Sequence, residues 1–429
     1  MNDRSLGGLP SIRGSNLWTG MRSVRSNPYI SFAERSHALH QMEAHAISRT
    51  RLFSEEELPL GPGCRITALA VSEDPDGYQV AGDDRGWLFV RQPQHSTLEQ
   101  ENNEEVSRFD ENGIYISPTR WFCDMGLMSE VTTLNISVEK WNSRARERIL
   151  KITAISLIQD RFLYVIDVEA HFFLVSNMTF SVSSFGPHAK ILVGSLEATE
   201  ESDVSAFILE PAKAHDLWTA VFEADGRTGS ATLGLHGKAM YIQDLDNRMS
   251  MRTLHTGSDV MSICKKQNIV YAGERSGTIR LFDLRAGPGS TGSPLTKLNS
   301  MVTNVEVYKD WEMITAAAKG DMRSFDMRFM RMEQGGKARP LLEFRGHQNV
   351  HMHNLGFAVL PAGDFVIAAG IDKHIRAWST RTGEQVAGAA DGLLTQHRED
   401  VLAIGASCGG LWHSSGRSVR YFKMGCAHK

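Results

Sequence analysis

The segment Gly277–Arg285, with the sequence GTIRLFDLR, joins a short apolar run to an acidic residue and an arginine two positions apart. The segment Gly320–Arg328 repeats this arrangement as GDMRSFDMR. Both copies contain an apolar residue, an arginine, a variable residue and a phenylalanine, and both end in Asp-x-Arg. Two copies of one strand-like pattern in a single chain predict a repeat architecture, in which each copy belongs to one structural unit.

The pattern apolar-Arg-x-aromatic occurs four times in the C-terminal half of the chain, and its aromatic residues are Phe282, Phe325, Trp378 and Phe422. These residues are 43, 53 and 44 positions apart. Each unit also contains two earlier apolar segments that are rich in β-branched residues and too short for helices. Short strands that recur every ~40–45 residues, with turns between them, are typical of WD40 propeller blades. The repeat therefore predicts an all-β protein whose antiparallel sheets are arranged radially.

Weaker copies of the unit extend toward the N-terminus. Residues 65–90 predict a first blade and residues 216–242 predict another, whereas the strands within 106–197 can be grouped in more than one way. We expect about seven blades over residues 61–424, within the usual range for propellers. Because an open propeller leaves sheet edges exposed, we also expect the first and last segments of the ring to meet.

Residues 1–60 lack the repeat and predict an N-terminal extension, of which the first thirty are expected to be disordered. Ser31 and Glu34 have the spacing of a helix capping box. An amphipathic helix is predicted over about residues 31–49, and its apolar stripe consists of Phe32, Leu39, Met42 and Ala46. Residues 425–429 are predicted to form a short C-terminal tail.

The bulk composition excludes several classes of partner. The chain has 429 residues, a formal net charge of -4 and a pI of about 6.5, so no basic excess indicates direct nucleic-acid binding. Its five cysteines are scattered and never form a C-x-x-C pair, which disfavours a disulfide framework and a zinc ribbon. No apolar stretch approaches the ~18 residues of a membrane span. We therefore expect a soluble protein of the nucleus, the cytoplasm or both, with no membrane partner.

One unit contains polar residues that are typical of WD-repeat wiring. Gly346-His347 precedes the strands of this unit, and Asp372 lies three residues before Ile375, in the turn that leads to the strand with Trp378. A histidine at this place can donate a ring N–H to a buried carboxylate and so satisfy both groups. We predict that His347 and Asp372 form a structural pair.

Other chemistry-bearing patterns favour ordinary structural roles. His351 and His353 are two positions apart and close in sequence to His347, so both can lie on one face of a strand. No cysteine lies nearby to complete a set of metal ligands. The glycine cluster at 287–292 lacks the lysine and the helix of a phosphate-binding loop. No motif indicates a nucleophile with its base. The sequence thus predicts no catalytic residues, no cofactor and no metal, and hence a protein that is not an enzyme.

Residues from about 250 to 424 resemble the C-terminal part of WD-repeat proteins of the DDB- and cullin-associated factor family, specifically its number-four type. The resemblance rests on three segments and covers about two fifths of the chain: 258–285, 345–349 and 369–378. It implies a substrate receptor, which bridges the adaptor subunit of a cullin-4 RING ubiquitin ligase, a three-propeller DDB protein, to a protein chosen for ubiquitination. The substrate itself is not implied.

The resemblance also implies which residues bind the adaptor. The family's adaptor-contacting motif is an aromatic-Asp-x-Arg box at the end of a blade, which here assigns Asp283, Arg285, Asp326 and Arg328. Both boxes contain phenylalanine where the family motif has tryptophan. In this family a helix before the propeller commonly docks in the adaptor, and that implies a binding role for Leu39 and Met42. The alternative, that the helix is a cap packed on its own domain, stays open.

The spacing of the box has a physical reason. Side chains alternate along an extended segment, so Asp283 and Arg285 project together while Phe282 and Leu284 turn into the packing. An arginine held in place by its own aspartate loses less entropy when it meets a partner. Two alternatives stay open: the boxes are only the turn chemistry of blade ends, and the protein is a WD40 scaffold of another complex with no ligase role.

Overall fold

The computed structural model describes residues 31–424 with gaps. The described parts are 31–60, 62–71, 79–84, 87–91, eight strands between 108 and 209, and then 214–225, 228–244, 251–287, 292–330, 337–350, 355–388, 392–407 and 410–424. The disorder predicted for residues 1–30, the tail predicted for 425–429, and part of the strand region predicted within 106–197 lie outside the described residues.

The strands that the structure describes form seven sheets, which we number in the order of the chain. The first, third, fourth and fifth sheets each have four strands that are antiparallel to their neighbours. The first is β2 (Ile66–Val71), β3 (Gln79–Asp83), β4 (Trp87–Arg91) and β7 (Phe122–Gly126); the third is β13 (Thr219–Asp225), β14 (Thr228–Leu235), β15 (Lys238–Ile242) and β16 (Met251–His255). The fourth is β17 (Val260–Lys266), β18 (Ile269–Glu274), β19 (Thr278–Asp283) and β20 (Ser293–Lys297); the fifth is β21 (Val302–Tyr308), β22 (Glu312–Ala317), β23 (Met322–Asp326) and β24 (Leu342–Glu343).

The remaining sheets differ in size. The second consists of β8 (Val131–Glu139), β9 (Ile149–Ala154), β10 (Asn177–Ser184), β11 (Ile191–Glu197) and β12 (Ser205–Leu209), and the sixth of β25 (Phe357–Val359), β26 (Phe365–Ala369) and β27 (Ile375–Ser379). The seventh consists of β28 (Ile404–Ser407), β29 (Gly410–Ser415), β30 (Ser418–Lys423), β1 (Arg51–Glu57), β6 (Tyr115–Ile116) and β5 (Arg108–Phe109). The grouping of residues 106–197, which the sequence left open, is thereby decided for the strands that are described.

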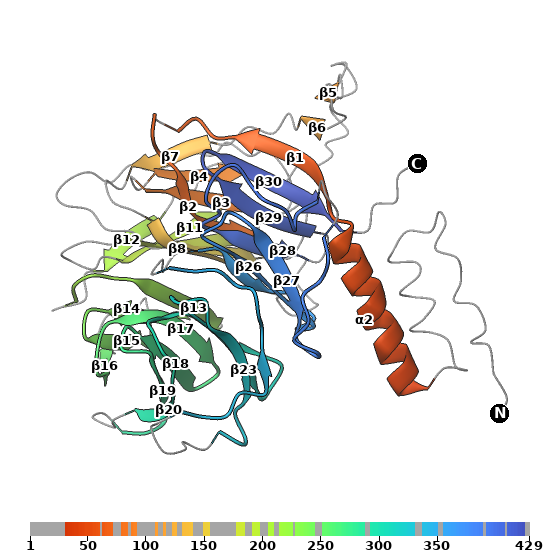
Figure 1. Cartoon of the computed structure of the whole chain (residues 1–429). Helices are drawn as coiled ribbons and strands as arrows, with labels where there is room; N and C mark the ends of the chain where they lie inside the picture. The colour runs from red at the N-terminus through yellow and green to blue at the C-terminus, as the bar shows by residue number, and fades with distance from the viewer. Residues whose placement is uncertain are drawn as a thin grey trace.

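The sheets form a closed β-propeller, as the repeat predicted. The first strands of consecutive sheets contact each other in the order β2, β8, β13, β17, β21, β25 and β28, and β28 contacts β2 again. Figure 1 shows the N-terminal strand β1 lying beside the C-terminal strand β30, with which it pairs antiparallel from Arg51–Lys423 to Glu57–Ser418. The strand β1 lies before the boundary predicted at residues 60 and 61. It joins the ring because the seventh sheet needs an outer strand to cover the edge of β30.

The four aromatic residues of the repeat occupy equivalent positions. Each lies on the third strand of its sheet and faces the second strand, in the pairs Phe282–Val270, Phe325–Met313, Trp378–Val366 and Phe422–Leu411. All four side chains are buried. The Trp378 indole Nε1 also donates to the Arg345 carbonyl at 2.8 Å. The four residues thus mark the same place in four sheets, which agrees with the repeat that their spacing predicted.

The glycine that begins each of the two repeated segments is required by the turn that it forms. Gly277 and Gly320 have φ angles of +86° and +80°, a region that residues with a side chain rarely adopt. A Cβ atom at Gly277 would lie 2.6 Å from the Leu298 carbonyl oxygen, and one at Gly320 would lie 2.6 Å from the His347 carbonyl oxygen. Each glycine thus lets the turn between the second and third strands pack against the segment that leads into the next sheet.

The helix α2 (Phe32–Ser48) precedes the propeller and lies along its side (Figure 1). It begins with the capping box that the sequence predicted. Ser31 Oγ accepts from the Glu34 backbone N–H at 3.3 Å, and Glu34 Oε2 accepts from the Ser31 backbone N–H at 3.1 Å. Within the described part of the chain, no helix is both long and apolar enough to span a membrane.

Candidate functional site

The first box, at the end of β19, is an arginine clamped by its own aspartate. Arg285 donates from Nε to Asp283 Oδ1 at 2.9 Å and from Nη2 to Asp283 Oδ2 at 2.8 Å. The Arg285 backbone N–H donates to the same Oδ1 at 2.9 Å. This bidentate pairing fixes the plane of the guanidinium. The remaining N–H groups of the arginine face solvent, because its side chain is 70% exposed.

The second box, at the end of β23, has the same geometry. Arg328 Nε donates to Asp326 Oδ1 at 3.0 Å, Nη2 donates to Oδ2 at 2.7 Å, and the backbone N–H donates to Oδ1 at 3.0 Å. The Arg328 side chain is 52% exposed. The two Asp-x-Arg motifs are therefore local copies of one device, an exposed guanidinium with a preset orientation.

Each arginine keeps its aspartate charged. Because Arg285 donates to it, Asp283 has its pKa lowered to about 2, and Arg328 lowers the pKa of Asp326 in the same way. The aspartates in turn raise the pKa of both arginines. All four groups are therefore charged at neutral pH, and the aspartates are already engaged before any partner arrives.

The alternate residues of each box anchor it to the core, as the side-chain alternation predicted. Phe282 and Phe325 are buried, and Leu284 and Met327 pack against the same hydrophobic clusters from partly buried positions. The boxes thus rest on rigid sheet ends.

The two boxes lie on the same face of neighbouring sheets. The Leu284 backbone N–H donates to Asn268 O at 2.8 Å, and the Met327 backbone N–H donates to Trp311 O at 2.8 Å, so each box lies beside the turn between the first and second strands of its sheet. Lys266 lies at the turn beside the first box, and Lys309 lies at the turn beside the second. The Lys266 Nζ donates to the Lys309 carbonyl oxygen, so the two turns are in contact. We call this side of the ring the box face.

A third arginine, which the sequence reasoning missed, occupies the equivalent position in the sixth sheet. The Thr380 backbone N–H donates to Asp364 O at 3.0 Å, as in the two boxes, and Arg381 follows. Ser379 replaces the aspartate, so Arg381 instead forms a bidentate pair with Asp364 at 3.1 and 3.0 Å. The spacing of Trp378-Ser-Thr-Arg381 repeats that of the boxes, and this was the signal in the sequence.

This third arginine attaches the helix α2 to the box face. Arg381 Nη1 donates to Ser36 Oγ at 2.8 Å and to Ser36 O at 3.3 Å. His40 stacks on Phe365 with ring centroids 4.6 Å apart, and its Nε2 lies 2.9 Å from Ser379 Oγ. Burial lowers the pKa of His40, and the nearby Arg381 lowers it further, which favours the neutral form of the ring where it packs.

The apolar stripe of the helix is separate from the part of the helix that enters the propeller core. Ile47 is buried in the core shared by the sixth and seventh sheets. Leu39 and Met42, the two predicted adaptor-binding residues, are partly buried and pack against Ala46 in a small separate cluster. Phe32, at the start of the stripe, is 85% exposed. An apolar surface is therefore presented next to the attachment point at Arg381.

Two exposed aromatic residues flank the second box, and the sequence reasoning did not single them out. Trp311, in the turn beside the box, is 55% exposed, and Phe329, which follows Arg328, is 74% exposed. The Arg328 guanidinium lies 5.4 Å from the centre of the Phe329 ring. Aromatic residues next to an arginine are the composition of interface hot spots. Their only signal in the sequence was their place in short turns.

The predicted pairing of His347 with Asp372 is not formed. His347 Nε2 lies 3.2 Å from the Ala369 carbonyl oxygen, and the ring lies edge-on to Trp378 with centroids 6.3 Å apart. Asp372 instead accepts from Arg376 Nη1 at 3.0 Å and Nη2 at 2.5 Å. The carboxylate has a guanidinium within reach on the next strand, and a charged donor is a stronger partner than a neutral ring.

Comparison with known proteins identifies the fold. No protein-family model and no curated protein matches the sequence. The structure is similar to the crystal structure of the WD40 β-propeller domain of Doa1, with a TM-score of 0.54 and 13% identity, over 88% of this chain and 97% of that chain. A computationally designed protein, Ika8, has a TM-score of 0.46 and 17% identity, over 87% of this chain and 99% of that chain. The fold is a WD40-type β-propeller.

Proposed function

We propose that this protein is a non-catalytic substrate receptor of a cullin-4 RING ubiquitin ligase, and that the box face binds the adaptor subunit of that ligase. The observation that carries the proposal is the pair of exposed, preset arginines Arg285 and Arg328 on neighbouring sheets. The resemblance of residues 250–424 to receptors of this class supplies the partner. The receptor holds the adaptor on this face and leaves the other surfaces of the ring for a protein substrate.

The geometry suits a protein partner. A guanidinium already oriented by a carboxylate can donate its outer N–H groups to carbonyls or carboxylates with little further loss of entropy. Trp311 and Phe329 offer apolar contact beside Arg328. The partly exposed stripe of α2, with Leu39 and Met42, extends the same surface, because Arg381 attaches the helix at the third equivalent position.

Charge reversal at the two boxes tests the proposal. Each of Arg285→Glu and Arg328→Glu should weaken binding to the purified adaptor by roughly 1–3 kcal/mol, the usual range for a charged hydrogen-bonding contact. The double variant should lose co-purification of the adaptor and of cullin-4 from cells. Because both side chains are exposed, thermal unfolding should change little.

A matched control is Arg398→Glu. Arg398 is exposed, and its carbonyl accepts from Lys373, in the turn between β26 and β27, so it lies on the opposite side of the ring from the boxes. This variant should retain the adaptor fully. Retention of the adaptor by the folded double variant would remove the receptor function and would leave a WD40 scaffold of another complex.

A further inference from the structure

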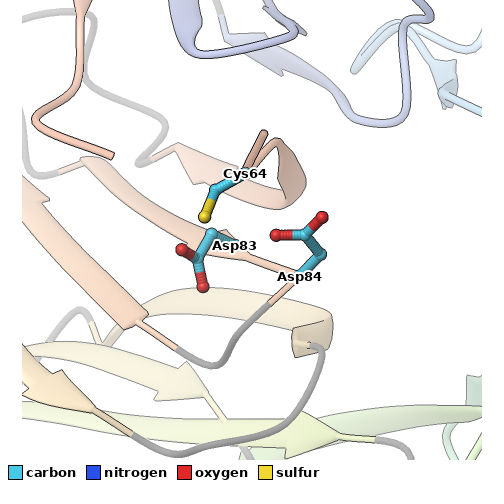
Figure 2. Close-up of side chains that lie close together, drawn as sticks. All are labelled: Cys64, Asp83 and Asp84. Atoms are coloured by element: carbon cyan, nitrogen blue, oxygen red, sulfur yellow. The ribbon is translucent and has the colours of Figure 1, made fainter. Parts of the chain in front are cut away.

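Three metal-ligating side chains meet in the first sheet, away from the box face. Cys64, Asp83 and Asp84 each offer one ligand atom, and these atoms lie within 4.8 Å of one another. Cys64 and Asp83 are buried, whereas Asp84 is partly exposed. Figure 2 shows the Cys64 sulfur and the two carboxylates gathered in one place, the thiol from the segment before β2 and the acids from the end of β3.

The backbone holds these residues together independently of their side chains. Ile66 pairs with Asp83 at the start of the β2–β3 ladder, next to an irregularity in its register. The Asp84 backbone N–H donates to Arg65 O at 3.1 Å. The residues that precede β2 are therefore fixed against the residues that end β3, and the donor atoms do not depend on a mobile loop to converge.

The fourth sheet has a different arrangement at the equivalent positions. The register makes Asp83 equivalent to Glu274, because Ile66–Asp83 and Val260–Glu274 are corresponding pairs. Glu274 accepts from Arg280 Nε at 2.9 Å. The residue equivalent to Arg280 is Phe89, since Ala81 faces Phe89 as Ala272 faces Arg280. The first sheet thus gathers a thiol and two carboxylates where the fourth sheet has an acid–arginine pair.

We propose that Cys64, Asp83 and Asp84 form a binding site for a divalent cation of the zinc type. A thiolate with two carboxylates suits a borderline ion such as Zn²⁺, whereas Ca²⁺ and Mg²⁺ prefer oxygen ligands alone. Zinc–sulfur distances of about 2.3 Å and zinc–oxygen distances of about 2.0–2.2 Å place the ligand atoms of a tetrahedral site ~3.3–3.7 Å apart. The ligand atoms therefore have to approach one another from separations of up to 4.8 Å. Rotation of the partly exposed Asp84 side chain brings them together, and water supplies the fourth ligand.

Binding involves two local exchanges. The Cys64 thiol releases its proton to solvent when its sulfur coordinates the ion. Asp84 gives up its contacts with Arg65, whose Nε lies 3.8 Å from Asp84 Oδ2 in an exposed ion pair and whose backbone N–H donates to Asp84 Oδ1 at 3.3 Å. An exposed pair of this kind contributes little stability, so its loss does not oppose binding strongly.

The position of the site predicts a structural effect. Cys64 belongs to a core cluster with Trp412, Val419 and Tyr421 of the seventh sheet. The Ile66 backbone N–H also donates to Gly416 O at 2.9 Å, across the same junction. A cation on Cys64 therefore strengthens the junction between the first and seventh sheets, where the ring closes, and its binding to the folded state raises the melting temperature.

Cobalt is the probe, because a cobalt–thiolate bond has its own absorption. Purified full-length protein is treated with a chelator, dialysed with a phosphine reductant, and titrated with Co²⁺. We expect one equivalent to bind with a sulfur-to-cobalt charge-transfer band in the near ultraviolet, competition by Zn²⁺, and a higher melting temperature with either ion. Absence of this one-equivalent band would overturn the proposal.

Two variants and a control locate the site. Cys64→Ser should abolish the charge-transfer band, whereas Cys264→Ser, which alters a buried cysteine in β17, should retain it. Asp84→Asn changes only a partly exposed side chain and should weaken Co²⁺ binding at least about tenfold, the loss that even indirect ligand support causes. Circular dichroism of the metal-free variants checks folding. An unchanged band in Cys64→Ser, or unchanged affinity in Asp84→Asn, would contradict the assignment.

Discussion

Arg420 of the last strand donates from Nε and Nη2 to Glu55 Oε1 of the first strand, at 2.9 and 2.8 Å, across 365 residues of sequence. The same two residues are partners in the β1–β30 ladder. Arg420 is the repeat arginine of its unit, equivalent to Arg280, which pairs with Glu274 inside its own sheet. In the seventh sheet the acid comes from the other end of the chain, so this ion pair forms only when the ring is closed.

Removing this acid should weaken ring closure. Glu55→Ala deletes a carboxylate that accepts two charged hydrogen bonds from the largely buried Arg420, and we expect the free energy of unfolding to fall by about 1–2 kcal/mol. Urea unfolding followed by circular dichroism measures this. Glu57→Ala, which removes a more exposed acid from the same strand, is the control and should change stability by less than about 0.5 kcal/mol. Equal losses in the two variants would refute a special role for Glu55.

A side chain at the repeat glycine should be costly. Gly320→Ala places a Cβ atom against the His347 carbonyl oxygen at a φ of +80°, and we expect a loss of at least about 1 kcal/mol in unfolding free energy. Gly287→Ala is the matched control, because no atom lies within 4 Å of the added Cβ. Thermal unfolding compares the two variants, and similar melting temperatures would mean that the turn relaxes freely.

Arg381 should hold the helix without supporting the ring. Arg381→Ala removes the contacts to Ser36, so amide hydrogen exchange in residues 32–45 should become faster while exchange in β26 and β27 stays slow. Arg285→Ala removes the equivalent arginine of the fourth sheet, and helix exchange should then be unchanged. Equal exchange of the helix in both variants would show that the stacking of His40 is sufficient to dock it.

Stability should fall as the pH falls below about 6.5. His413 is fully buried, and burial lowers its pKa well below the ordinary value; His397, whose ring centroid is 4.4 Å away, is lowered too. Below pH ~6.5 the unfolded chain binds protons that the folded state excludes, so each such histidine costs up to about 1.4 kcal/mol per pH unit. The contribution of these neutral histidines to the free energy of unfolding is thus complete above their unfolded pKa and is lost as the pH falls below it.

The test measures unfolding between pH 5.0 and 7.5. His413→Phe should reduce the slope, since the new ring can stack on Phe422 as the imidazole does. His255→Phe, at an exposed position, should leave the slope as it is. If His413→Phe had the same slope as the unaltered protein, the pH dependence would come from other groups.

The Asp283 carboxylate should stay charged far into the acid range. Its hydrogen bonds from Arg285 lower the pKa of Asp283 to about 2. The contribution of this pair to the free energy of unfolding is therefore complete above the unfolded pKa of about 3.9, and it disappears as the pH falls through about 2. Carboxyl carbon shifts of Asp283 in an NMR titration report this pKa directly. In Arg285→Ala the pKa should return toward 3.9, and a value already near 3.9 in the unaltered protein would contradict the clamp.

Local patterns in the sequence determined the blade unit and the chemistry within it. The alternation of apolar residues along short segments identified strands, and the recurrence of Phe282, Phe325, Trp378 and Phe422 identified a propeller. The spacing of Asp283 and Arg285 predicted that their side chains project to the same side of the strand. Each of these depends on contacts between near neighbours in the chain, which the order of residues specifies. The capping box of α2 was predictable for the same reason.

Contacts between distant segments were decided by the tertiary structure. Pairing of β1 with β30 depends on which edge the closed ring leaves uncovered, and nothing in Arg51–Glu57 itself indicates it. Asp372 pairs with Arg376 and not with His347, because the folded structure brings the guanidinium within hydrogen-bonding distance of the carboxylate. The meeting of Cys64 with Asp83 and Asp84 requires the register of two strands, and the common face of Arg285, Arg328 and Arg381 requires the ring. A sequence orders these residues along the chain, but only packing decides which of them come within bonding distance.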